Sequence, residues 1–197
     1  MNKKNVLPRI AKVPALIAML SILLVACIIR NHPVVVVDGL QGGWEMKSYV
    51  SEHSYYNDSM QTVPTKHDKH DTQFDGKAVA WLFRNNEIYH FQWVISEPDK
   101  YWSKVDDAAF RTFIIEGKKP YFTIVETADY DIYCITDPCP DKIIKRYSVN
   151  KLTNDELILI YDERITYPEA GVPSVNVVRE TYTFVRERSL DDWQPTE

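Results

Sequence analysis

Residues 78–95 read AVAWLFRNNEIYHFQWVI, and this stretch decides the fold class of the chain. Two apolar runs, at 78–83 and 88–95, flank the sequence RNNE, whose adjacent asparagines accept the positive φ angles that a tight hairpin turn requires. Side chains alternate along the second run, so one face carries Tyr89, Phe91, Trp93 and Ile95, and the other carries His90 and Gln92. We therefore predict an antiparallel β-hairpin over residues 78–95.

Strand-type sequence recurs on both sides of this hairpin. All 24 Trp, Tyr and Phe residues follow Cys27, and they occur with β-branched residues in short runs that are typical of strands. The runs predict eight main strands, at residues 44–50, 78–83, 88–95, 110–115, 121–126, 143–149, 157–161 and 176–186. Alternation in the first strand places Trp44, Met46, Ser48 and Val50 on one face.

The remaining segments complete the predicted architecture. The polar segment 51–76 is expected to be a long loop, residues 106–111 could form one helical turn, and residues 131–135 could add a short strand. Eight antiparallel strands suit an all-β, up-and-down barrel, which leaves no sheet edge exposed and can enclose one small ligand. A two-sheet sandwich is the alternative architecture.

The N-terminus resembles a bacterial lipoprotein signal peptide. A basic start precedes an apolar run at 15–25, and Leu24-Val25-Ala26-Cys27 resembles the lipobox that the lipoprotein signal peptidase recognises. The resemblance implies that residues 1–26 are removed and that Cys27 carries a lipid anchor with acyl chains such as palmitate. The residue after Cys27 is Ile28 and not Asp, which resembles the pattern of lipoproteins that are sorted to the outer membrane. An uncleaved anchor over residues 13–29 is the alternative, and it exports the same residues 30–197.

Charge and cysteines are interpreted in the light of this signal. Removal of the four basic residues that precede Cys27 changes the formal net charge from −5 to −9, which disfavours a nucleic-acid partner. An exported chain would oxidise its two remaining cysteines, so we predict a disulfide between Cys134 and Cys139. Free, redox-active or metal-binding thiols are the alternatives.

Three further segments resemble the bacterial lipocalin-like lipoproteins. They are Gly43-Trp44, RYSVNKLT at 146–153 followed by ELIL at 156–159, and ETYTFVR at 180–186. The resemblance spans about residues 42–187 and implies a calycin-type barrel, without implying a particular ligand. We accordingly divide the chain into a signal peptide (1–26), the lipidated Cys27 with a tether (27–42), a lipocalin-like barrel domain (43–188) and a C-terminal tail (189–197).

Motifs for catalysis or metal binding are weak. The sequence HDKHD at 67–71 offers possible metal ligands, but on a polar loop such a cluster is more often solvated, and no zinc signature is present. His90 is interpreted as a packed or surface histidine. No Gly-x-Ser-x-Gly elbow occurs, so we predict neither an enzyme nor a resident metal or cofactor.

Aromatic residues are the better indication of function. If Trp81, Phe91, Trp93 and Phe122 face inward, they would line an apolar pocket of the kind that binds small molecules, although they could equally fill the barrel. We expect a membrane-anchored lipoprotein that binds a small hydrophobic molecule or lipid in the cell envelope. The alternative is an envelope interaction protein, an assembly factor or inhibitor, that uses its acidic surface and the segment 51–76 against a protein partner of unknown identity.

Overall fold

A computed structural model describes residues 39–58, 60–105, 109–118, 121–130, 142–167 and 174–195. All of them belong to one compact unit, Val34–Glu197. The signal peptide with its lipobox, Cys27, and the cysteines Cys134 and Cys139 lie outside the described residues, as does the short strand predicted at 131–135. Within the described ranges, no helix has the length and apolar character needed to cross a membrane.

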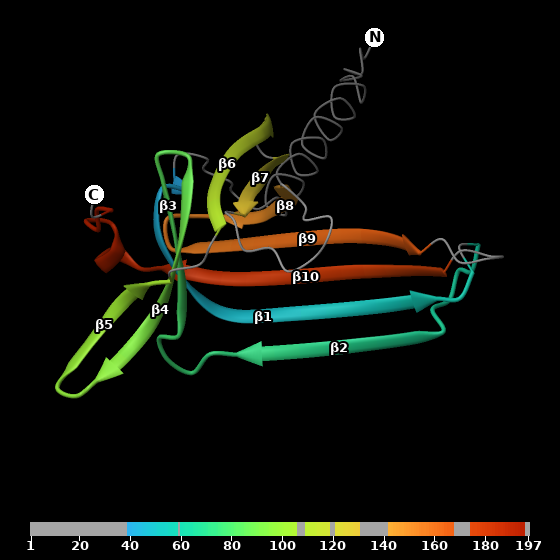
Figure 1. Cartoon of the computed structure of the whole chain (residues 1–197), viewed down its shortest axis with the longest axis horizontal. Coiled ribbons are helices and arrows are strands. Elements are labelled where there is room, and N and C mark those ends of the chain that lie inside the picture. The colour runs from blue at the N-terminus through green and yellow to red at the C-terminus, as the bar shows by residue number, and fades with distance from the viewer. Residues whose placement is uncertain are drawn as a thin grey trace, which may run out of the picture. The chain divides into compact units, whose positions relative to one another are not determined.

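The described chain is an all-β, antiparallel structure of ten strands and one short 3₁₀-helix (Figure 1). The strands are β1 (Gly42–Tyr56), β2 (Lys66–Gln73), β3 (Val79–Arg84), β4 (Glu87–Ser96), β5 (Asp99–Lys104), β6 (Ala109–Lys118), β7 (Tyr121–Tyr130), β8 (Lys142–Leu152), β9 (Glu156–Tyr167) and β10 (Ser174–Arg186). The 3₁₀-helix η3 (Arg188–Leu190) follows β10. All eight predicted strands are present, most of them longer than predicted.

Eight of the strands form a closed ring of hydrogen-bonded pairs, in the order β1-β3-β4-β6-β7-β8-β9-β10 and back to β1. The predicted hairpin between β3 and β4 is confirmed, because Asn85 and Asn86 have φ angles of 50° and 65°. The β4–β6 junction is the shortest, with one paired position and a bond from Phe113 N to Asn86 O of 2.8 Å. The eight strands form a closed cycle of antiparallel pairings, but they are not arranged evenly round one axis as in a regular barrel.

The other two strands, β2 and β5, correct the sequence prediction. The segment 51–76 is not a loop throughout, because β1 continues to Tyr56 and β2 pairs with it. In Figure 1, β9, β10, β1 and β2 lie side by side as extended strands. Strand β5 pairs with the second half of β4. The helical turn predicted at 106–111 is also wrong for residues 109–111, which belong to β6.

A β-bulge in β1 changes which side chains face the interior. The register of β1 against β10 shifts between Met46 and Ser48, so Lys47 is the additional residue. Trp44 and Met46 face the core, and after the bulge Tyr49 takes the inward position, 5.1 Å from the ring of Tyr182. The predicted shared face of Trp44, Met46, Ser48 and Val50 is therefore wrong beyond Met46.

The interior of the ring is filled by apolar side chains from all eight of its strands. Fully burying one Leu or Phe side chain stabilises a fold by about 1.5–3 kcal/mol. The cluster comprises Leu40, Trp44, Met46, Trp81, Phe83, Ile88, Phe113, Phe122, Ile124, Tyr147, Val149, Leu152, Leu157, Leu159, Tyr182 and Phe184. Because Leu40 belongs to this core, the packed domain begins before the predicted boundary at residue 43.

A smaller cluster lies on the outer face of β3 and β4. Phe91 packs there with Leu190, and the ring of Trp193 lies 5.1 Å from that of Phe91. The predicted C-terminal tail is thus part of the packed domain at least to Trp193. Since the whole ring and both clusters lie between residues 39 and 193, a chain of residues Val34–Glu197 contains every element that the structure describes.

Candidate functional site

A cavity of about 250 Å³ lies among inward-facing side chains of the ring strands, and we name it the ring pocket. Six strands contribute to its lining. The lining residues are Trp81 of β3, His90 of β4, Arg111 of β6, Glu126 and Ala128 of β7, Ile143, Lys145 and Tyr147 of β8, and Tyr182 of β10. The pocket thus adjoins the filled core, to which Trp81, Tyr147 and Tyr182 also belong.

Aromatic rings form one wall of the ring pocket. Trp81 and His90 are cross-strand partners, and their rings stack at 4.9 Å with an interplanar angle of 15°. Tyr147 meets Trp81 edge-on at 6.0 Å, and Tyr182 lies 5.5 Å from Trp81. Flat walls of this kind favour flat or apolar ligands, because aromatic pairs add stacking energy to the burial of area.

A buried carboxylate lies in the same pocket and is held by two donors. Glu126 is 5 % exposed. Its Oε2 accepts a hydrogen bond of 2.8 Å from the Tyr147 hydroxyl, and its Oε1 lies 3.2 Å from Nε of Arg111. A buried carboxylate needs such partners, because burial of an unpaired charge is costly. Glu126 and Arg111 therefore neutralise each other at the pocket wall.

The two tyrosines of the pocket act as hydrogen-bond donors. Burial, reinforced by Glu126, raises the pKa of Tyr147 far above its ordinary value. Burial also raises the pKa of Tyr182, whose hydroxyl donates a bond of 2.5 Å to Glu180. Both phenols stay protonated and donate to carboxylates of the protein, so neither suits proton transfer, which requires a pKa near the working pH.

Lys145 places a positive charge at the pocket. Its Nζ lies 5.2 Å from the centre of the Tyr161 ring. Among the residues that the structure describes, no carboxylate lies within 4 Å of this Nζ. Lys145 is paired in register with Glu126 of β7, so the pocket lining has two cations, Arg111 and Lys145, for one carboxylate and carries a surplus of one positive charge.

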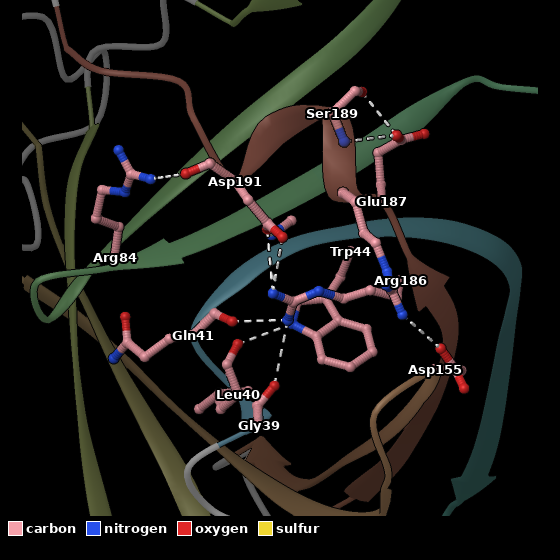
Figure 2. A network of polar contacts seen from close by, with 12 residues as sticks. Gly39, Leu40, Gln41, Trp44, Arg84, Asp155, Arg186, Glu187, Ser189 and Asp191 are labelled. Atoms are coloured by element: carbon pink, nitrogen blue, oxygen red, sulfur yellow. Dashed lines mark hydrogen bonds and ion pairs between the residues drawn. The ribbon is translucent and has the colours of Figure 1, made fainter.

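A polar network, which we name the closed network, surrounds Trp44 and joins the start of β1 to the end of β10 and the segment after it (Figure 2). The Arg186 guanidinium lies 5.1 Å from the Trp44 ring, and it donates to the carbonyl of Gln41 at 2.6 Å and to both carboxylate oxygens of Asp191 at 3.1 Å. Asp191 also accepts a bond of 3.0 Å from Gly43 N. Arg186 follows Tyr182 by four residues, so this network lies about 13 Å along β10 from the ring pocket. The charged groups of this network, Arg186 and Asp191, are bonded to each other and to the backbone, which indicates a structural role.

A second concavity, of about 550 Å³, lies on the outer side of the β4–β5 hairpin, and we name it the outer groove. Trp93 and Trp102 meet there edge-on at 5.1 Å. Lys77 Nζ lies over both rings, at 4.8 and 5.5 Å, and forms an ion pair of 2.6 Å with Glu187. Tyr101 and Trp193 also line the outer groove.

The four residues predicted to bind a ligand do not form one pocket. Trp81 lines the ring pocket. Phe122 lies in the core, and it does not line the ring pocket. Phe91 and Trp93 point to the outer side of β4, where Phe91 is covered by Trp193 and Trp93 lines the outer groove.

A sequence signal could have identified this division. A two-residue turn at Asn85-Asn86 makes Trp81 the partner of His90 rather than of Phe91, and directly paired residues share a face. His90 therefore belongs to the inner set, although the sequence alone indicated only a packed or surface histidine. Tyr182 carries no comparable local signal, because its place also depends on the pairing of β10 with β1, at the other end of the domain. Tyr147 lies on β8, whose pairing with β7 was not predicted from the sequence.

The HDKHD segment forms part of β2, where its two histidines point to opposite faces. His67 Nδ1 shares a 2.9 Å hydrogen bond with the Ser54 hydroxyl, while His70 is three residues further along and faces the other side. Within the described ranges, no group of three or more His, Cys, Asp or Glu side chains could hold a metal ion.

Comparisons with known proteins find no family model, no curated protein and no solved structure that matches this chain.

Proposed function

We propose that this protein binds a small molecule in the ring pocket. One observation carries the proposal: a cavity lined by stacked rings and a few convergent polar groups adjoins the apolar core of the ring. Pockets for small molecules have this composition, although at about 250 Å³ the cavity is smaller than most pockets for drug-sized ligands. The ligand is therefore compact, with at most about three small rings.

We further propose that the ring is a calycin-type barrel of the lipocalin-like class. The contact between Trp44 and Arg186 supports this proposal, because it joins the beginning and the end of the segments on which the resemblance rests. The closed order of the eight strands supports it as well. The class implies a ligand held non-covalently inside the ring.

The third part of the proposal concerns location. The lipobox-like sequence that ends at Cys27 supports a lipid anchor in the cell envelope, with the outer membrane as the destination. Intact mass spectrometry of membrane-extracted protein tests the anchor. We expect the wild type to carry lipid on Cys27 and to lack residues 1–26, and Cys27→Ala to lose both lipid and cleavage. An unchanged mass and membrane retention in the variant would refute the anchor.

Binding itself can be tested with N-phenyl-1-naphthylamine, a neutral dye whose fluorescence rises in an apolar site. We expect the Val34–Glu197 domain to bind one dye molecule. Ile143→Trp should abolish binding, because a larger ring on a half-buried pocket residue occupies the cavity. Tyr101→Ser, which alters the outer groove at a half-exposed side chain, is the matched control and should bind as the wild type does.

Two results would overturn the proposal. One is the absence of dye binding by the folded domain, checked by its thermal transition. The other is the reverse pattern of variants, in which Tyr101→Ser loses the dye and Ile143→Trp retains it, since this would move the binding site to the outer groove.

A further inference from the structure

We infer that the ligand of the ring pocket is a planar aromatic anion, whose negative group is recognised by Lys145. This inference rests on the proposed function, because it names the ligand class of the same site. It is carried by the charges and the ring geometry of the pocket lining.

The charge argument begins with the buried pair. Glu126 lies between Arg111 and the Tyr147 hydroxyl, at 3.2 and 2.8 Å, so its charge is already matched. The negative group of a ligand would meet the cation of Lys145 instead. Among the described residues, no acidic group lies within 4 Å of the Lys145 Nζ. A neutral ligand would leave this cation without a counter-charge in the occupied pocket, and a cationic ligand would be repelled.

The shape argument comes from the rings. The stack of Trp81 and His90, at 4.9 Å and nearly parallel, presents a flat wall to the cavity, with Tyr147 and Tyr182 beside it. A flat ring system can continue this stack while its anionic group reaches Lys145. A sugar, with its many hydroxyls, would need more free donors and acceptors than these side chains offer, because the hydroxyls of Tyr147 and Tyr182 are bonded to Glu126 and Glu180.

Two dyes of the same framework test the inference. 1-Anilinonaphthalene-8-sulfonate is N-phenyl-1-naphthylamine with one added sulfonate, so the pair differs in charge but not in ring system. In the Val34–Glu197 domain we expect Lys145→Gln to weaken the sulfonate dye about fivefold to tenfold, the size of one charge-assisted hydrogen bond at a half-buried site. The neutral dye should change less than about twofold.

Arg146→Gln is the matched control. Arg146 is the next residue of β8, faces the opposite side and is exposed, with its Nε 3.8 Å from Glu116. Arg146→Gln removes one positive charge from β8, as Lys145→Gln does, so a general effect of lost positive charge would weaken dye binding equally in both variants. We expect Arg146→Gln to bind both dyes as the wild type does.

The outcomes separate the two proposals. If both dyes bind in the ring pocket and Lys145→Gln weakens neither, or if Arg146→Gln weakens the sulfonate dye as much, the recognition of an anion by Lys145 is refuted and the proposed function stands. If neither dye binds the folded domain, or if Ile143→Trp binds both, the proposed function itself is refuted. A thermal transition for each variant shows that it is folded.

Discussion

Replacement of Gly42 by alanine should destabilise the domain strongly, because two independent features of the structure require glycine there. The φ angle of Gly42 is 111°, in a region that L side chains rarely adopt. A Cβ atom at this position would also collide with the Arg186 guanidinium, coming within 2.6 Å of its Cζ, and with the Asp191 carboxylate. These are the two groups that close the network around Trp44 in Figure 2.

The magnitude follows from these two features. A side chain in such a backbone conformation costs about 1–3 kcal/mol. Displacement of the guanidinium from Asp191 loses charge-assisted hydrogen bonds, which we set at about 1 kcal/mol because both side chains are partly exposed, at 17 % and 33 %. The sum is about 3 kcal/mol. For a domain of this size it corresponds to a fall in Tm of about 6–12 °C.

Urea and thermal unfolding of the Val34–Glu197 domain, followed by tryptophan fluorescence, measure this effect. Gly76→Ala is the control, because a Cβ at Gly76 meets no atom within 4 Å and its φ angle is not in the positive region. We expect the control to be neutral or up to about 1 kcal/mol more stable. If the free energy of unfolding of Gly42→Ala lies within about 0.5 kcal/mol of the wild-type value, the account of Gly42 and of the Arg186–Asp191 network is wrong.

Three further substitutions test other parts of the structure. Tyr147→Phe should lower the free energy of unfolding in urea by about 1–3 kcal/mol, because Glu126 loses a buried donor; no loss would contradict the hydrogen bond. Asn85→Val should cost about 1–2 kcal/mol, since a β-branched residue resists a φ angle of 50°, and an unchanged Tm would argue against the turn. For Glu187, burial raises the pKa, but hydrogen bonds from Lys77 and Ser189 outweigh it and hold the pKa below 4.5. Its stabilisation is thus complete above pH 4.5 and lost as pH falls through the lower pKa, so Glu187→Gln should flatten acid unfolding below pH 4.5, which equal acid slopes would refute.

The ring could be predicted from the sequence because its strands carry their own signals. Aromatic and β-branched runs mark the eight strands, and the asparagine pair at 85–86 marks the turn between β3 and β4. These signals are local, since they depend on turn chemistry and on burial of each strand. The predicted strands correspond one by one to the strands of the ring.

Strands β2 and β5 could not be predicted, because neither has a strand-type sequence. The sequence of β2 is KHDKHDTQ, and that of β5 is DKYWSK. Each is held by backbone pairing with one longer strand, β1 or β4, and its side chains are mostly exposed. Charged residues on such strands also protect their outer edges from pairing with other chains.

The ring pocket could be predicted only in part. The aromatic sequence of the strands predicts Trp81 as a pocket residue. The register set by the Asn85-Asn86 turn could also have predicted His90, its cross-strand partner. The bulge at Lys47 reverses the facing of β1 without a sequence signal, and Tyr182 enters the pocket through the pairing of strands far apart in the chain. Long-range register of this kind depends on the packing of the complete ring.

The indole N–H signals of the five tryptophans offer the most direct test of the central claim that the ring pocket binds the ligand. Trp81 reports on the ring pocket, Trp44 on the closed network, and Trp93, Trp102 and Trp193 on the outer groove. We expect titration of the ¹⁵N-labelled domain with 1-anilinonaphthalene-8-sulfonate to shift the Trp81 signal and to leave the other four in place. A shift confined to the outer-groove tryptophans, with Trp81 unchanged, would contradict the account.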